Sequence, residues 1–299
     1  MSHIVWLDGQ QVAPSQASVS VFDRGFLYGD GVFEVMRTYG GRVFAMSLHM
    51  ERLGRSAERV GIALPVPLAQ LEREVLEALA ASEADEVKIR LVVTRGEGPL
   101  SLDPTTAGKA TRLVIVTPLA GQPAELYRDG VEVALLPGGA LPGSPAAGAK
   151  AGNYLANLLA AHEATQRGAY EAILVGPAGE LREGATSNVF VVRGGQVVTP
   201  RPESGILAGV TRAGVFEAAR RSGIAILEDV LFASDAYAAE EFFLTSSLRE
   251  VVPVVRADGL TLADGRPGPI TRRLHEAFRQ LVQGGGFGTE DSHSGPPGD

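Results

Sequence analysis

The chain has 299 residues, of which 45% are hydrophobic and 21% charged, a balance typical of a globular protein with one large or two medium domains. Its formal net charge is −8 and it contains no run of basic residues, which argues against nucleic acid or an anionic membrane as a partner. There are no cysteines, so disulfides, a cysteine nucleophile and thiolate metal sites are excluded, and no metal site is predicted. The first residues lack a signal-peptide layout and no apolar stretch is long enough to span a bilayer, so we expect a cytoplasmic protein.

The first part of the chain predicts a small α+β domain over residues 1–120. Apolar residues that alternate indicate strands, and apolar stripes with a period of 3.6 residues indicate helices. Asp8-Gly9 predicts a hairpin turn after the first strand, and Gly61 is placed to end the first helix. Strands are expected at residues 4–7, 31–38, 42–45, 87–94 and 111–117, and helices at 48–60 and 68–81.

The second part predicts a larger domain over residues 131–283, joined to the first by a linker at residues 121–130. Residues 137–149 are rich in glycine and proline and predict a loop. Strands are expected at residues 131–136, 171–175, 188–193, 197–199, 225–230, 241–245 and 251–256, and helices at 155–166, 211–222, 234–239 and 270–282. From residue 284 the chain is rich in Gly, Ser, Pro and acidic residues, which predicts a disordered tail over 284–299.

Lys150 stands out because the chain has few lysines. The others are Lys88 and Lys109, against 27 lysines and arginines in total, so basic surface here is made with arginine. Lysine forms Schiff bases with carbonyl compounds once its amine loses its proton, and the small residues around Lys150 leave room for a planar ring. A lone lysine in a loop is more often a solvated surface residue, so Lys150 needs support from other motifs.

Two motifs downstream provide that support. Glu183 precedes a small, hydroxyl-rich turn that runs into an apolar strand, and residues 205–212 place glycines and a threonine at the start of a helix. Backbone N–H groups at such a helix start are suited to a phosphate. A lysine, a carboxylate and a phosphate cradle together match pyridoxal phosphate, which needs a partner for its aldehyde, its pyridine nitrogen and its phosphate. Taken singly, Glu183 is more often a surface acid, Leu207 a core leucine and Ser246-Ser247 an ordinary turn.

Seven segments, in order along residues 3–280, resemble the class IV (fold type IV) pyridoxal-phosphate enzymes. This family contains branched-chain aminotransferases, D-amino acid aminotransferases and aminodeoxychorismate lyases. The matching segments are residues 24–34, 49–53 with 56–57, 94–98, 149–154, 183–190, 205–212 and 245–250 with Pro253.

The resemblance implies a two-domain fold of the α+β (α/β) class, with a small α+β domain and a larger, β-barrel-like domain with flanking helices. It implies pyridoxal 5'-phosphate as cofactor, with Lys150 as the catalytic residue that binds it and shuttles a proton between substrate and cofactor carbons. Glu183 would keep the pyridine nitrogen protonated, so that the ring acts as an electron sink, and Tyr154 would tune the ring phenolate. The other implied cofactor-binding residues are Arg52, Val210, Thr211, Ser246 and Ser247 at the phosphate, Leu207 against the ring and Asn188 as a support near it.

The resemblance also suggests a substrate class. D-amino acid aminotransferases bind the substrate carboxylate with a tyrosine on the early strand and an Arg-x-His loop motif, but here those positions are Phe33, Leu100 and Leu102. The loop at residues 95–104 is most similar to that of archaeal branched-chain enzymes. Tyr28, Phe33 and Arg90 match positions that line their pocket, with Arg90 placed to meet the side-chain carboxylate of glutamate.

Two departures from the branched-chain pattern keep other substrates open. Lys88 stands where those enzymes usually have a tyrosine, and Leu248-Arg249 stands where they usually have two small residues. These substrate-binding candidates leave a D-amino acid or (R)-amine transaminase as an alternative, Arg249 then meeting a different carboxylate. An aminodeoxychorismate lyase and a catalytically silent cofactor-binding protein are further alternatives. The resemblance implies a homodimer that acts on a small amino acid and a 2-oxo acid.

Overall fold

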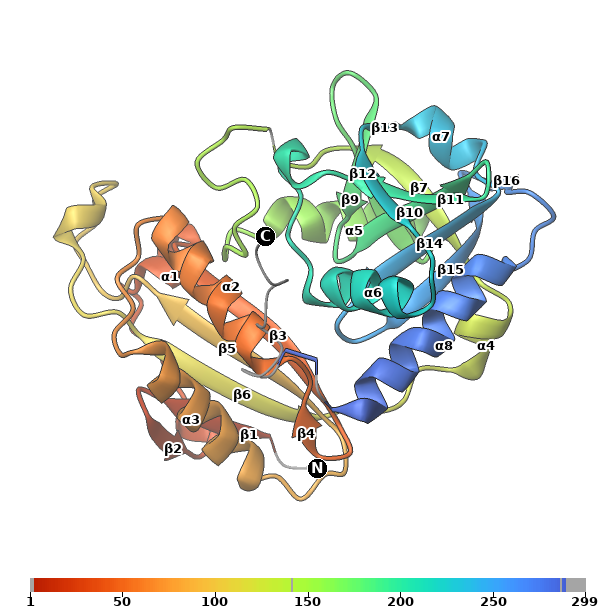
Figure 1. Ribbon diagram of the computed structural model, residues 1–299. Coiled ribbons are helices and arrows are strands. Elements are labelled where there is room, and N and C mark those ends of the chain that lie inside the picture. Colours follow the sequence, from red (N-terminus) through yellow and green to blue (C-terminus); the bar gives the residue numbers. More distant parts are fainter. Residues whose placement is uncertain (1–2, 141, 286, 289–299) are drawn as a thin grey trace, which may run out of the picture. The chain divides into compact units, whose positions relative to one another are not determined.

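The computed structural model describes residues 3–140, 142–285 and 287–288, and the chain divides into two compact units (Figure 1). Unit 1 comprises Met1–Ala120, Ala149–Asn153 and Val282–Asp299, and unit 2 comprises Gly121–Gly148 and Tyr154–Leu281. The predicted domains are continuous ranges, whereas unit 1 takes in the short segment around Lys150. Among the described residues, no helix has the length and apolar character needed to cross a bilayer.

Unit 1 is built on an antiparallel sheet with strand order β2-β1-β6-β5-β3-β4. Its strands are β1 (Ile4–Leu7), β2 (Gln10–Val12), β3 (Gly31–Tyr39), β4 (Arg42–Val43), β5 (Val87–Thr94) and β6 (Arg112–Pro118). Its helices are α1 (Arg24–Tyr28), α2 (Met46–Arg59) and α3 (Leu68–Ala80), with short 3₁₀ turns η1 (Pro14–Gln16) and η2 (Pro104–Thr106).

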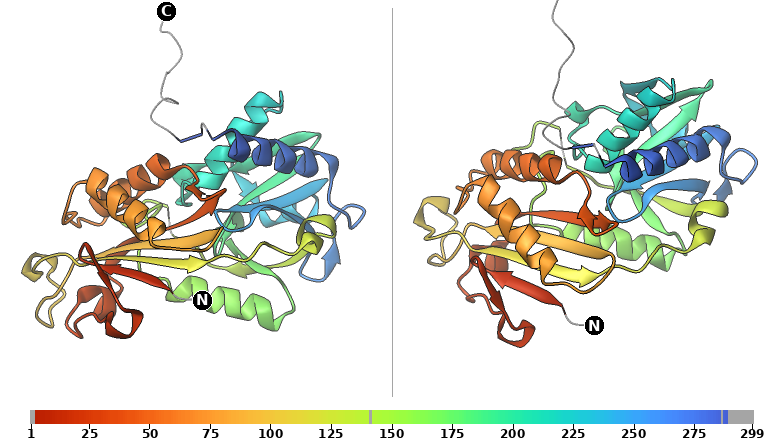
Figure 2. Two further views of the ribbon diagram at one scale, coloured as in Figure 1. Left: turned by 90° about the horizontal axis from the view of Figure 1, so that it is seen from below. Right: turned by 60° about the horizontal axis from the view of Figure 1, so that its bottom comes forward.

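Helices α2 and α3 cover one face of this sheet (Figure 1; Figure 2). Because side chains alternate along a strand, Ile89 and Leu91 of β5 point into this core while Lys88 and Arg90 lie on the other face. The apolar stripes of both helices complete the core, which also includes Val32, Met36, Leu53, Leu71 and Val116. Burial of this many aliphatic side chains, at roughly 1.5–3 kcal/mol each, is what holds the helices to the sheet.

Unit 2 contains a larger mixed sheet with strand order β12-β11-β10-β14-β15-β7-β8-β9-β13, and β16 pairs with β15. Strand β9 also approaches β10 and β11, so the sheet curls back on itself. The strands are β7 (Val131–Pro137), β8 (Glu171–Val175), β9 (Glu180–Gly184), β10 (Asn188–Arg193), β11 (Gln196–Pro200), β12 (Ile226–Asp229), β13 (Leu231–Phe232), β14 (Glu241–Ser246), β15 (Glu250–Ala257) and β16 (Leu260–Thr261). The helices are α4 (Ala124–Arg128), α5 (Leu155–Gln166), α6 (Val210–Arg221), α7 (Ala233–Tyr237) and α8 (Pro269–Gly284), with the 3₁₀ turn η3 (Pro202–Ser204).

Helices α5 and α6 pack on this sheet through small and aromatic side chains, respectively. Helix α5 approaches β7 and β8 through alanines such as Ala164 and Ala172, whose small size allows a close approach. Helix α6 brings Phe216 to Phe190, whose ring stacks on Phe243 with centroids 4.8 Å apart. The mixed α/β architecture agrees with the fold class expected from the sequence.

The structure adds elements that the sequence pattern did not predict. The polar composition of strand β9 lacks the apolar alternation by which strands are predicted. Arg182 within this strand is only 2% exposed, so a charged residue occupies an inward position. Helix α1 is short and contains Gly25, and α4 lies inside the predicted linker. Most of the predicted tail, residues 284–299, lies outside the described residues.

Candidate active site

Lys150 belongs to a segment that extends the edge of strand β3 in unit 1. Strand β4 pairs only with the far end of β3, and the segment covers the near end: Phe33 N–H donates to the Lys150 carbonyl (3.0 Å) and Gly152 N–H to the Gly31 carbonyl (2.7 Å). A Cβ on Gly152 would lie 2.9 Å from the Gly29 carbonyl oxygen, so glycine permits this approach. The Lys150 N–H also donates to the hydroxyl of Ser56 on α2 (3.1 Å), which fixes the backbone from which the amine projects.

The Lys150 amine and the Arg90 guanidinium both make cation–π contacts with the Phe33 ring. Its Nζ lies 4.6 Å from the centre of the Phe33 ring, and the Arg90 guanidinium carbon lies 4.2 Å from the same centre. Phe33 is 3% exposed, so its ring is buried against both cationic groups. Lys88, two residues before Arg90 on β5, lies on the same face of the sheet.

Arg52 lies on α2 within a fully buried polar cluster. Its Nε and Nη2 donate to the two carboxylate oxygens of Glu34 at 2.8 and 2.6 Å, and the Nδ1 of His49 lies 2.7 Å from the second oxygen. Burial alone would raise the pKa of Glu34, but the Arg52 charge and the hydrogen bonds hold it at about 2. Burial lowers the pKa of His49, whose imidazole also experiences the positive charges of Arg52 and Lys150, so His49 is neutral near pH 7.

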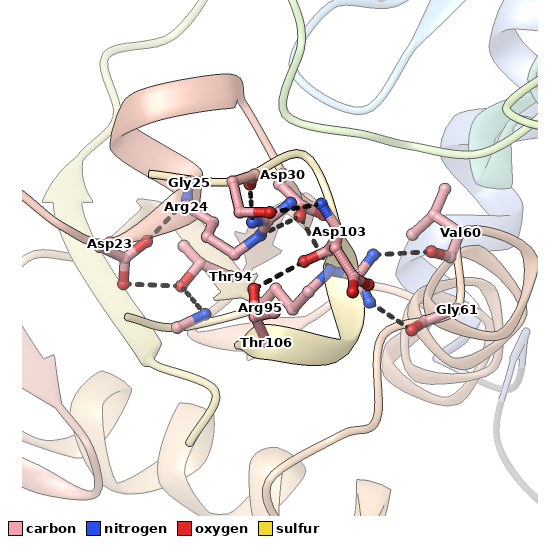
Figure 3. Close-up of polar contacts among 12 residues, drawn as sticks. Asp23, Arg24, Gly25, Asp30, Val60, Gly61, Thr94, Arg95, Asp103 and Thr106 are labelled. Carbon is pink, nitrogen blue, oxygen red and sulfur yellow. Dashed lines mark hydrogen bonds and ion pairs between the residues drawn. The ribbon is translucent and has the colours of Figure 1, made fainter. Parts of the chain in front are cut away.

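A second polar cluster fixes the segment that carries Tyr28 (Figure 3). Asp30 accepts from Arg24 Nε (2.9 Å) and Arg95 Nε (2.8 Å), and this pairing lowers its pKa although partial burial opposes the shift. Arg24 also donates to the Ser101 carbonyl (2.7 Å) and its guanidinium lies 5.1 Å from the centre of the Tyr28 ring. The cluster therefore ties the Tyr28 turn to the loop at residues 95–108.

In unit 2, Glu183 and Asn188 hold the backbone of Leu207 from both sides. The Leu207 N–H donates to Glu183 Oε2 (2.9 Å), and the Asn188 amide donates to the Leu207 carbonyl (2.8 Å). A Cβ on Gly209 would overlap Asn188 Oδ1, so a larger residue at this helix cap would displace the Asn188 side chain. The cap of α6 carries no side-chain hydrogen bond, and Val210 and Thr211 form its first, buried turn.

Tyr154 is the N-cap residue of helix α5, and its hydroxyl donates to the Ala185 carbonyl at 2.8 Å. Asn157, one turn later, donates to the same carbonyl at 2.8 Å. Tyr154 is thereby anchored to the turn two residues beyond Glu183.

Arg249 is already engaged with an acidic partner in unit 2. Its Nη2 donates to the Glu171 carboxylate (2.7 Å) and the Thr186 hydroxyl (2.6 Å), and its Nε donates to the Ser246 hydroxyl (2.9 Å). Glu171 is 2% exposed at its side chain and Arg249 16%, so the pair is largely desolvated. Arg249 thus joins the turn after β9 to the turn that contains Ser246, Ser247 and Leu248.

The residues present fit pyridoxal phosphate by the chemistry of their donors. Lys150 provides a primary amine held on a rigid strand edge, and Glu183 provides a carboxylate with one oxygen fixed by a backbone N–H. The uncapped start of α6 presents the backbone N–H groups of a helix terminus, a known arrangement for phosphate. Arg52 adds a guanidinium whose orientation is set by Glu34.

Many of the site residues expected from the sequence belong to one of two groups, one in each unit. Unit 1 brings together Lys150, Phe33 and Arg90, and unit 2 brings together Glu183, Asn188 and Leu207. The D-type positions Leu100 and Leu102 are 73% and 82% exposed. The sequence analysis assigned no role to the polar partners Glu34, His49, Ser56, Glu171 and Thr186. All except Glu171 lie in the segments that resemble the family, and His49 and Arg52 are also spaced one helical turn apart.

Comparison with known proteins agrees with this chemistry. The family model for amino-transferase class IV matches residues 31–257. A putative branched-chain-amino-acid aminotransferase of Methanocaldococcus jannaschii is 39% identical over 280 residues, covering 93% of this chain and 96% of that protein. A D-alanine aminotransferase of Bacillus licheniformis is 30% identical over 282 residues, with 93% and 96% covered.

The solved structures include the branched-chain amino acid aminotransferase of Escherichia coli, with a TM-score of 0.90, 30% identity and 98% of each chain covered. Class IV aminotransferases use pyridoxal phosphate to exchange an amino group between an amino acid and a 2-oxo acid. From the ordered motifs, the fitting donor set and these matches, the chain belongs to the class IV aminotransferases.

Proposed function

We propose that this aminotransferase exchanges the amino group between branched-chain L-amino acids and 2-oxoglutarate. Bound pyridoxal phosphate would supply the aldehyde and the electron-accepting ring. The observation that carries the substrate assignment is the Phe33 ring, with the Lys150 amine 4.6 Å and the Arg90 guanidinium 4.2 Å from its centre. The guanidinium suits the side-chain carboxylate of glutamate, and the 39% identical putative branched-chain-amino-acid aminotransferase of Methanocaldococcus jannaschii supports the branched-chain part of the assignment.

Each residue has a stated part in this proposal. Lys150 Nζ binds the cofactor and then moves a proton at the substrate α-carbon. Glu183 would keep a proton on the pyridine nitrogen, and Tyr154 would tune the ring phenolate. The phosphate would be held by Arg52, Val210, Thr211 and the Ser246-Ser247 turn. Leu207, whose backbone is fixed by Glu183 and Asn188, would lie against the ring. Tyr28 and Leu248 line the substrate site.

A second candidate, a D-amino acid aminotransferase, is favoured by one observation. Lys88 and Arg90 place two cationic side chains on the same face of β5. They would attract the carboxylate of an L- or a D-amino acid. The 30% identity to the D-alanine aminotransferase of Bacillus licheniformis supports D-alanine as the substrate of this second candidate. Arg249 supports it less, because its guanidinium is bonded to Glu171.

The visible absorption spectrum of the purified protein tests the assignment. We would titrate it separately with L-valine, L-glutamate, D-alanine and (R)-1-phenylethylamine. Conversion of the lysine-bound cofactor band to the pyridoxamine band by both L-valine and L-glutamate supports the branched-chain proposal. Conversion by D-alanine or the amine alone overturns it, and release of pyruvate from aminodeoxychorismate without an acceptor would indicate a lyase. Arg90→Leu should then raise the KM for L-glutamate far more than that for L-valine.

We also propose that the protein acts in the cytoplasm as a homodimer, as the family resemblance implies. Light scattering coupled to size exclusion measures the mass directly. A mass near 31.3 kDa, that of one chain, would contradict the dimer.

A further inference from the structure

The Glu34 carboxylate is buried within the apolar face of the unit 1 sheet. It projects from β3 between Val32 and Met36, whose side chains form the core beneath helix α2. Its side chain is 0% exposed, and it is opposed by Arg52 and His49 from two successive turns of α2. Such a carboxylate must be fully hydrogen-bonded, because an unpaired charge at this depth would be strongly destabilising.

The contact with Arg52 fixes the plane of the guanidinium. Nε and Nη2, which form one edge of the planar group, each donate to a different oxygen of Glu34, at 2.8 and 2.6 Å. The two-donor edge formed by Nη1 and Nη2 is therefore turned away from Glu34. This edge has the spacing that matches two oxygens of a phosphate.

His49 fixes the carboxylate in turn. An ionised carboxylate only accepts hydrogen bonds, so the neutral imidazole must carry its proton on Nδ1, 2.7 Å from Glu34 Oε2. One oxygen of Glu34 thus has two donors and the other has one, which removes the freedom of the carboxylate to rotate.

We propose that Glu34, held by His49, is a positioning residue that aims the Arg52 guanidinium at the cofactor phosphate. The proposal rests on the phosphate role of Arg52 stated above. A buried ion pair contributes little more to folding than apolar side chains of the same volume, whereas it defines one geometry. Orientation of Arg52 therefore explains this cluster better than stability does.

Unit 1 contains a matched pair that serves as a control. Glu74 of α3 accepts from Nε of Arg112 at 2.8 Å and from its Nη2 at 3.0 Å, with side-chain exposures of 7% and 8%. The geometry resembles that of Glu34 with Arg52, but neither residue is assigned to the cofactor. Glu74→Gln should therefore disturb stability to a similar degree without disturbing phosphate recognition.

The test compares two cofactors that differ only in the phosphate. The full-length protein, freed of cofactor, is titrated with pyridoxal 5'-phosphate and with pyridoxal, and both dissociation constants are measured by absorbance. The quantity compared is the dissociation constant for pyridoxal divided by that for pyridoxal 5'-phosphate, called the phosphate ratio. Damage near Lys150 affects both constants and cancels in the ratio. In Glu34→Gln, whose amide cannot accept from both donors, the ratio should fall roughly tenfold to a hundredfold, while Glu74→Gln keeps the wild-type ratio.

A second pair of variants covers the case in which Glu34→Gln does not fold. His49→Asn places an amide N–H near the position of Nδ1, so its phosphate ratio should stay close to that of the wild type. His49→Leu removes the donor and should lower this ratio. Equal ratios in wild type, Glu34→Gln and His49→Leu overturn the proposal while leaving the aminotransferase assignment intact. A wild-type protein that transaminates but does not prefer the phosphorylated cofactor overturns both this proposal and the role of Arg52.

Discussion

Replacement of Arg249 by methionine tests whether this residue organises the site or binds substrate. The substitution removes the partner of Glu171, whose side chain is 2% exposed. The carboxylate then keeps the hydroxyls of Thr186 (2.8 Å) and Ser187 (3.4 Å) as donors. Leaving one partner of a buried ion pair alone costs about 3–5 kcal/mol. Because Arg249 is partly exposed, we expect the lower end, about 3 kcal/mol of the free energy of unfolding.

The assay is denaturant unfolding of the cofactor-saturated protein, carried through a double-mutant cycle with Glu171→Gln. The double variant should recover part of the loss, giving a coupling free energy of about 2 kcal/mol. Arg256→Met provides a control in the same unit, because the pair of Arg256 with Glu132 is more exposed and should contribute less than about 1 kcal/mol.

The opposite result would refute this reasoning. If Arg249→Met unfolds at the same denaturant concentration as Arg256→Met but raises the KM of every substrate strongly, Arg249 binds the substrate carboxylate. The D-amino acid assignment would then gain its missing carboxylate site.

Three further predictions concern Glu183, Gly209 and Glu250. Glu183→Gln should keep the cofactor bound but lower kcat by roughly a hundredfold, since the pyridine nitrogen loses its charged partner; full activity would contradict the assignment. Gly209→Ala should push Asn188 away from the Leu207 carbonyl and weaken cofactor binding, measured by titration, whereas Gly121→Ala, with open space around the new Cβ, should not. Burial opposes the shift, yet a histidine and an arginine of α8 hold the pKa of Glu250 at about 2 instead of 4.5. Its contribution to stability, up to about 3 kcal/mol, is therefore present above pH 4.5 and lost as the pH falls toward 2. The thermal midpoint of Glu250→Gln should accordingly vary less over that range than that of the wild type.

The sequence by itself determined the family and the strand and helix pattern of most elements, and it predicted Lys150 as the catalytic residue. The apolar alternation along Val87–Thr94 and the stripes of α2 and α3 report which face of each element is buried, because burial repeats with the period of the backbone. Gly152 stands where a Cβ would meet the Gly29 backbone, and Gly209 stands where it would meet the Asn188 side chain.

Only the tertiary structure decided which polar side chains meet. Arg52 pairs with Glu34 from 18 residues away, Arg249 with Glu171 from 78, and the Lys150 backbone with Ser56 from 94. Periodicity fixes the face on which a residue lies but carries no information about its partner on another element. For the same reason, the sequence suggests that Arg249 binds a substrate carboxylate, whereas in the folded chain it binds the carboxylate of Glu171 on β8.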